Sequence, residues 1–274
     1  MILGGTVTGD FKSVEEWEKL LVKSNFKAIT APFTCEDSEE TIIAYMDIIK
    51  KHKVKISEIG VWRNILLGEN IEFAAGQLKL ADKLGIECVV NIAGTKGKAA
   101  WDCADKSNYT EENYADIVKS IQRVIDLAGP ERAFYTIEPM PWMIPDGPEI
   151  YLKLLEDVDR KQFAVHMDFV NMINSPRRFL KAEQFIEECF SLLAPHIKST
   201  HIKDSKMNLT GYTTHIDECP PGKGELDYPS ILKILDKYLP ADGAILLEHM
   251  HSFEEYDEAY RYVKESAKAA GVEV

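Results

Sequence analysis

The stretch "YTIEPMPWMIP", residues 135–145, decides the fold. It begins as an apolar strand that includes Tyr135 and Ile137, and it ends on the carboxylate of Glu138. Three prolines then form a turn before a predicted helix that opens at Pro148. A buried carboxylate is unfavourable unless it has a partner or a chemical task. Whether Glu138 has such a task depends on how the other strands of the chain end.

Short apolar stretches alternate with longer amphipathic ones along the whole chain. This pattern predicts strands over residues 1–5, 27–33, 54–62, 86–94, 133–138, 162–168, 197–204 and 244–250. It predicts helices over residues 14–23, 71–84, 111–128, 148–158, 182–193, 228–238 and 254–270, and a further helix capped by Ser38. A long loop is expected from the seventh strand to Asp227. Such alternation is typical of an α/β fold with a parallel sheet. Eight strand–helix units within 274 residues predict one (β/α)8 TIM barrel, and therefore a single domain over residues 1–274.

The composition narrows the class of partner. The chain is 45% hydrophobic and carries a formal net charge of −13, which disfavours nucleic acid because phosphate backbones select basic surfaces. No apolar run approaches the length of roughly 20 residues that a membrane span needs, and we expect no membrane partner and no signal peptide. Five scattered cysteines without a CxxC pair indicate reduced thiols and a cytoplasmic location. The expected partner is a small molecule.

Four consecutive predicted strands deliver side chains that can bind a metal. The fifth strand ends in Glu138 and the sixth in Asp168, the seventh carries His201 near its end, and the eighth carries Glu248. Because one strand–helix unit occupies about 30 residues, these side chains all reach the rim where barrel active sites lie. Three carboxylates and an imidazole at one point would be destabilised without a cation. The spacing therefore predicts a site for one divalent metal ion; the alternative is four separate salt bridges with neighbouring loops.

These motifs resemble the xylose isomerase-like barrels, which include sugar isomerases and epimerases, inosose dehydratases and endonuclease IV. The residues that carry the resemblance are "IEP" with Glu138, "HMDFVNM" with Asp168, "HIKD" with His201 and "LLEH" with Glu248. "PPGKGELDY", residues 220–228, is similar to the PGxGxxD segment that follows the histidine strand in this family. The resemblance covers essentially the whole chain. It implies one divalent ion, with Mn²⁺ first among the candidates and Co²⁺, Mg²⁺ or Zn²⁺ as alternatives.

Two departures from the family pattern bear on function. Asn171 stands where many ketose epimerases of the family have a histidine that contacts substrate, and we expect Asn171 to occupy that substrate-facing position. The additional histidines and acids of the three-metal cluster of endonuclease IV are not evident. This departure favours a single metal ion.

The resemblance implies a metal-dependent sugar isomerase or epimerase. Glu138 and Glu248 would then act as catalytic groups on opposite faces of the substrate, removing and returning a proton next to a carbonyl through an enediolate. The same chemistry supports an alternative, a dehydratase or lyase that acts on a keto-sugar, a keto-inositol or a 3-keto-glycoside. More distant alternatives are a phosphodiesterase of the endonuclease IV type and a sugar-binding barrel without turnover. The family resemblance is also compatible with a homo-oligomer.

Several other side chains are candidates for substrate contact. His166 and Lys203 share the inward-facing side of their strands with the predicted ligands; His166 could instead be a core histidine, and Lys203 could simply neutralise the acids. Trp142, in the loop after the fifth strand, offers a flat face for a sugar or for loop packing. Arg177, in "NSPRR", could hold a phosphate or carboxylate, or lie in a solvated turn. His249 alternates away from the site and is expected to be structural.

Overall fold

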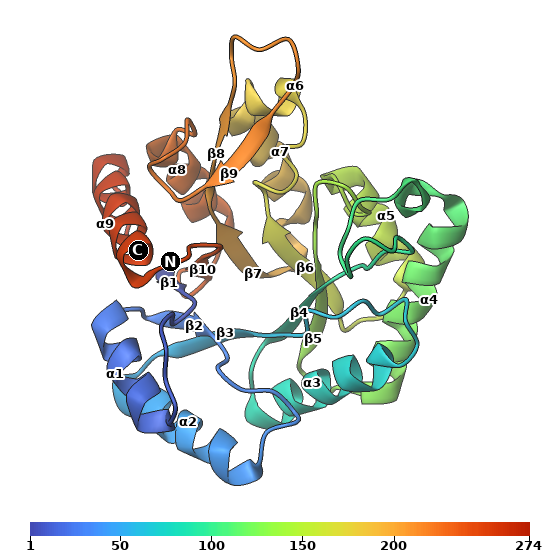
Figure 1. Ribbon diagram of the computed structural model, residues 1–274, viewed down its shortest axis with the longest axis vertical. Coiled ribbons are helices and arrows are strands. Elements are labelled where there is room, and N and C mark those ends of the chain that lie inside the picture. Colours follow the sequence, from blue (N-terminus) through green and yellow to red (C-terminus); the bar gives the residue numbers. More distant parts are fainter.

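Eight parallel strands close into a barrel at the centre of the computed structural model, which describes residues 1–274 (Figure 1). The order around the barrel is β1-β10-β7-β6-β5-β4-β3-β2. The strands are β1 (Ile2–Gly5), β2 (Ala28–Thr30), β3 (Lys55–Gly60), β4 (Cys88–Ile92), β5 (Phe134–Glu138), β6 (Phe163–Asp168), β7 (Ile197–Ile202) and β10 (Ala244–Leu247). This closed parallel barrel with its surrounding helices confirms the predicted TIM barrel.

Helices follow the strands and surround the barrel (Figure 1). They are α1 (Val14–Ser24), α2 (Glu39–His52), α3 (Asn70–Leu84), α4 (Glu111–Ala128), α5 (Pro148–Val158), α6 (Pro176–Phe179), α7 (Ala182–Leu193), α8 (Tyr228–Tyr238) and α9 (Phe253–Ala270), with short 3₁₀ segments at Lys106–Tyr109 and Ala194–His196. The predicted caps are present. The hydroxyl groups of Ser13 and Ser38 accept hydrogen bonds from backbone N–H groups in the first turns of α1 and α2, and Gly85 ends α3 in the left-handed conformation.

The segment after β7 differs from the predicted long loop. It contains an antiparallel hairpin of β8 (Asp204–Met207) and β9 (Ile216–Cys219), which projects from the barrel in Figure 1. No strand was predicted here because polar residues dominate both arms of the hairpin. The last barrel strand is also shorter than predicted. It ends at Leu247, and His249 adopts a positive φ of 61° that does not continue a strand.

The hydrophobic core joins the barrel to its helices. One cluster of 61 buried apolar residues contains side chains from the strands and from the helices. Most of the buried polar side chains, by contrast, belong to barrel strands or follow them directly. None of the helices is both long enough and apolar enough to cross a membrane. The five cysteines are unpaired, as predicted.

Asp82, in the last turn of α3, fixes the start of β5. Its Oδ1 atom accepts hydrogen bonds from the backbone N–H groups of Glu131 at 3.2 Å, Arg132 at 2.7 Å and Ala133 at 2.8 Å. These bonds, led by that from Ala133, hold the pKa of Asp82 below its usual value. The side chain therefore stabilises the turn that leads into the strand carrying Glu138.

We predict that Asp82→Ala lowers the free energy of unfolding by about 1–2 kcal/mol at neutral pH, because three backbone donors lose their acceptor. A pKa that is lower in the folded state gives stability above the unfolded-state pKa of about 3.9, and this stability is lost as the pH falls through the folded-state value. The difference between wild type and variant, measured by urea unfolding, should therefore shrink in acid. Asp47→Ala, which removes an exposed acid from α2, is the control. A deficit that is unchanged by pH would contradict this account.

The loop between β9 and α8 is folded around Asp204. This buried carboxylate accepts backbone N–H groups from Ser205 at 2.8 Å, Gly222 at 3.1 Å, Gly224 at 3.1 Å and Leu226 at 3.2 Å. A Cβ atom at Gly224 would lie 2.2 Å from Asp204 Oδ1 and 2.4 Å from the carbonyl oxygen of Ser205. Only glycine fits at this position, which explains the second glycine of "PPGKGELDY".

Gly224→Ala should destabilise the protein by about 1–3 kcal/mol, because the methyl group overlaps atoms that cannot move without breaking the Asp204 hydrogen bonds. Thermal unfolding measures the effect. Gly68→Ala is a matched control, since nothing lies within 4 Å of a Cβ atom at Gly68 and its φ is not positive. Equal melting temperatures for the two variants would show that the loop is not tightly held.

Candidate metal centre and active site

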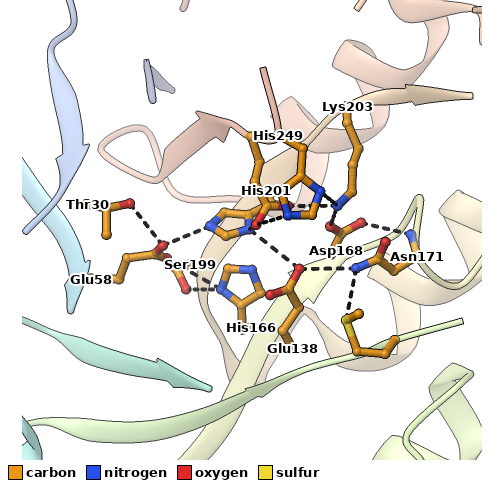
Figure 2. Close-up of polar contacts among 12 residues, drawn as sticks. Thr30, Glu58, Glu138, His166, Asp168, Asn171, Ser199, His201, Lys203 and His249 are labelled. Atoms are coloured by element: carbon orange, nitrogen blue, oxygen red, sulfur yellow. Dashed lines mark hydrogen bonds and ion pairs between the residues drawn. The ribbon is translucent and has the colours of Figure 1, made fainter. Parts of the chain in front are cut away.

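Four predicted side chains converge at the C-terminal ends of neighbouring strands. Figure 2 labels three of them, Glu138, Asp168 and His201. β5 ends in Glu138 and β6 ends in Asp168, while His201 lies next to the end of β7 and Glu248 directly follows β10. A register shift in β6 after Val165 places Asp168 beside His201. One potential ligand atom from each of the four side chains lies within 4.8 Å of all the others. The barrel therefore assembles the predicted oxygen and nitrogen donors in one place.

Lys203 lies inside this group of acids. Its Nζ atom is 2.8 Å from Asp168 Oδ2, 2.7 Å from Glu248 Oε2 and 3.0 Å from Glu218 Oε2. The lysine side chain has no exposed surface. Burial lowers its pKa, but the charges of Asp168 and Glu248 outweigh burial and raise that pKa well above the usual range. One ammonium thus balances part of the negative charge and leaves the rest uncompensated.

His201 shows a more specific need for a cation. Its Nε2 atom lies 2.8 Å from Glu58 Oε1, whereas Nδ1 faces Glu248 Oε1 at 3.1 Å and Glu138 Oε1 at 3.6 Å. The buried Nδ1 atom makes no hydrogen bond. Burial lowers the pKa of His201, but the charges of Glu248 and Glu58 outweigh burial and raise that pKa well above its usual range. Without an ion the ring therefore holds a second proton among the acids, and a divalent ion would supply positive charge at Nδ1 in place of that proton. The residues present therefore fit a divalent ion of the kind that accepts mixed oxygen and nitrogen ligands.

The electrostatics of Asp168 and Glu248 agree with this fit. Burial raises the pKa of Asp168 to about 6, and the negative charges of Glu138 and Glu248 act in the same direction, against Lys203. Burial also raises the pKa of Glu248, but the charges of His201 and Lys203 outweigh burial and hold that pKa well below its usual range. Such opposed shifts in adjacent groups are typical of functional sites.

The other predicted residues take different places. Asn171 is buried and donates from Nδ2 to Glu138 Oε1 at 3.1 Å, so it orients a predicted catalytic group. His166 is fully buried, with its Nδ1 atom 2.6 Å from Ser199 Oγ, which places it in the barrel interior. Trp142 is partly exposed and donates from Nε1 to the carbonyl oxygen of Asp102 at 2.7 Å. Arg177 is exposed and has no polar contact with the site.

Glu58 and Glu218 lie at the site but were not predicted there, and His249 lies closer to the site than predicted. Glu58 on β3 contacts His201 and is fully buried; an acid within the apolar strand "VKISEIGVW" was the available signal. Glu218 reaches the site from β9, where no strand was predicted. His249 was expected to face away from the site, but its Nε2 atom lies 3.3 Å from Glu248 Oε1 and its Nδ1 atom 2.9 Å from Glu218 Oε1. The positive φ of His249 turns the ring toward the site against strand alternation.

Comparisons with known proteins agree with the fold. The profile of a protein family described as xylose isomerase-like TIM barrel matches residues 19–266. Comparison with curated protein sequences finds no match.

Solved structures with the same fold include three informative ones. A xylose isomerase-like TIM barrel protein from Mycobacterium smegmatis, in complex with magnesium, has a TM-score of 0.72 and 16% identity over 98% of this chain and 97% of its own. A D-psicose 3-epimerase in the presence of D-fructose has a TM-score of 0.71 and 16% sequence identity, and the match covers 99% of this chain and 100% of the epimerase chain. The probable 3-DHS dehydratase from Bacillus anthracis has a TM-score of 0.72 and 17% sequence identity, and the match covers 96% of this chain and 98% of the dehydratase chain.

We predict that Lys203→Met lowers the stability of chelator-treated protein by about 3–5 kcal/mol, because Asp168 and Glu248 lose their buried cationic partner. Added Mn²⁺ should then stabilise this variant more than wild type, since an ion restores positive charge beside both carboxylates. Thermal unfolding with EDTA and with Mn²⁺ measures both effects. Lys119→Met, at an exposed lysine without an ion pair, is the control. An equal Mn²⁺-induced shift in wild type and Lys203→Met would argue against shared ligands.

Proposed function

Because the chain belongs to the xylose isomerase-like TIM barrel family, we propose that it is a divalent-metal-dependent isomerase or epimerase of a sugar or sugar derivative. The observation that carries the proposal is the convergence of Glu138, Asp168, His201 and Glu248 within 4.8 Å. The unpaired, buried Nδ1 atom of His201 supports it further. Sugar epimerases with the same barrel fold lend support at the level of fold.

These four residues would hold the ion. When bound, a divalent ion supplies Lewis-acid polarisation of the substrate carbonyl, which makes the neighbouring C–H group more acidic. The proton itself is then handled by side chains of the chain. Mn²⁺ is our first candidate for the ion.

Glu138 and Glu248 are the proposed proton-transfer groups. Their strands β5 and β10 are separated in the barrel by β6 and β7, so the two carboxylates approach the ligand cluster from different sides. Asn171 donates a hydrogen bond to Glu138 and Lys203 one to Glu248, which fixes both carboxylates in place. A substrate carbon held between them can lose its proton to one glutamate and regain a proton from the other, with the enediolate as intermediate. Proton removal from one face and proton return to the other inverts the configuration of that carbon.

Substrate contacts are expected at the exposed edge of the site. Glu218 and His249 are partly exposed and touch both each other and the buried residues Lys203 and Glu248. They extend the polar surface from the ligand cluster to solvent, where hydroxyl groups of a sugar can form hydrogen bonds with them. Trp142 lies in the loop after β5 and offers an apolar face.

Elimination is the second candidate reaction, and one observation favours it. By the family resemblance, Asn171, an amide without acid–base function, stands where many ketose epimerases have a histidine. His249, whose Nε2 atom lies 3.3 Å from Glu248 Oε1, can donate a proton to a leaving oxygen near Glu248. Loss of a β-substituent from a keto-sugar, keto-inositol or 3-keto-glycoside needs the same initial deprotonation. The two reactions differ in products. NMR of the Mn²⁺-loaded protein with D-fructose, D-psicose and a 3-keto-glucoside separates an epimer from an unsaturated product and free leaving group.

We predict that Glu248→Gln lowers exchange of solvent deuterium into the substrate carbon by about 10²–10⁴-fold, because the amide cannot accept the proton. The isosteric change should leave the circular dichroism spectrum unaltered. Deuterium incorporation is measured by mass spectrometry on whichever ketose of the panel the wild type turns over. Glu72→Gln, at an exposed acid of α3, should behave as wild type. Exchange at the wild-type rate in Glu248→Gln would contradict the role of Glu248.

A further inference from the structure

Glu58 is a buried acid that lies outside the proposed ligand set. It is on β3, across the barrel interior from β7, and has no exposed surface. Its Oε1 atom lies 2.8 Å from His201 Nε2 and accepts a hydrogen bond from Thr30 Oγ1 at 3.3 Å (Figure 2). Its Oε2 atom lies 3.5 Å from His166 Nδ1 and makes no hydrogen bond. A carboxylate is buried so completely only when its contacts stabilise it.

The contact with His201 determines which ring nitrogen faces the ligand cluster. Glu58 Oε1 can only accept, so the His201 nitrogen that it contacts, Nε2, carries a proton. Nδ1 is then free to bind an ion, and it is the nitrogen that faces Glu138 and Glu248. A hydrogen bond to one ring nitrogen of a metal-binding histidine fixes both the ring orientation and the tautomer.

We propose that Glu58 is the positioning residue that holds His201 with Nδ1 directed at the metal, and that Thr30 in turn holds Glu58. This inference rests on the proposed metal-dependent function. It extends the site to two more strands, because Thr30 on β2 and Glu58 on β3 lie outside the four strands that carry or precede the proposed ligands. The contacts from Thr30 to Glu58 and from Glu58 to His201 connect the opposite side of the barrel to the site.

A second metal ion between Glu58, His166 and His201 is the competing explanation, since their donor atoms also lie within 4.8 Å of one another. The contacts favour positioning instead. Glu58 Oε1 and His201 Nε2 are already paired with each other at 2.8 Å. His166 Nδ1 is paired with Ser199 Oγ at 2.6 Å. An ion bound by these atoms would have to displace both of these direct hydrogen bonds.

The test is titration of metal-free protein with Co²⁺ by calorimetry, together with the visible absorption spectrum of the bound ion. We expect wild type to bind a single ion and Glu58→Gln to bind it about 10–100-fold more weakly, with a changed absorption spectrum. Glu58→Asp should recover part of the affinity, and Thr30→Val should weaken it less than Glu58→Gln. Ser57→Ala, at a buried residue next to Glu58 on the same strand, is the control and should bind as wild type.

The outcomes separate the inference from the proposed function. Equal Co²⁺ affinity and spectrum in wild type and folded Glu58→Gln would overturn the positioning role while leaving the metal site intact. Two ions in wild type and one in Glu58→Gln would overturn it in favour of a second ion site. No binding to wild type would overturn both the inference and the proposed function. A lower melting temperature of Glu58→Gln without a change in Co²⁺ affinity would show that Glu58 is only structural.

Discussion

The balance of charge inside the barrel is the constraint on which the site depends. Glu138, Asp168 and Glu248 meet in a buried space that contains a single ammonium, that of Lys203. Carboxylates at such distances in a water-poor interior are strongly destabilised unless cations or hydrogen-bond donors compensate them. Two neighbouring side chains contribute to that compensation: Asn171 donates to Glu138, and Lys203 contacts Asp168, Glu248 and Glu218. The unpaired Nδ1 atom of His201 marks the place where compensation by the protein is incomplete.

The regular features of the fold could be predicted from the sequence because each depends on residues that are close to one another in the sequence. Alternation of strands and helices, the caps at Ser13 and Ser38 and the stop at Gly85 all follow from neighbouring residues. The convergence of the four strand-end side chains could also be predicted, since Asp168 and His201 each follow the preceding strand-end residue by one strand–helix unit. Parallel strands in register then bring them to one rim without further information.

The remaining features depend on contacts between distant segments or on irregular backbone. The β8–β9 hairpin lacks alternating apolar residues, so Glu218 could not be placed beside Lys203. His249 breaks strand alternation through its positive φ, and the sequence gives no sign of that conformation. Glu58 was visible as an acid in an apolar strand, but its partner His201 lies 143 residues away, and only the closure of the barrel brings the two together.

Elemental mass spectrometry of the purified protein, incubated with Mn²⁺ and freed of excess ion by gel filtration, tests the central claim most directly. The account predicts about one divalent ion per chain, bound by mixed oxygen and nitrogen ligands, and loss of that ion in Asp168→Asn. Absence of bound metal in wild type after incubation with Mn²⁺, Co²⁺, Mg²⁺ or Zn²⁺ would contradict it. Glu138 would then be one member of a buried ion-pair network that stabilises the barrel and performs no metal-dependent chemistry.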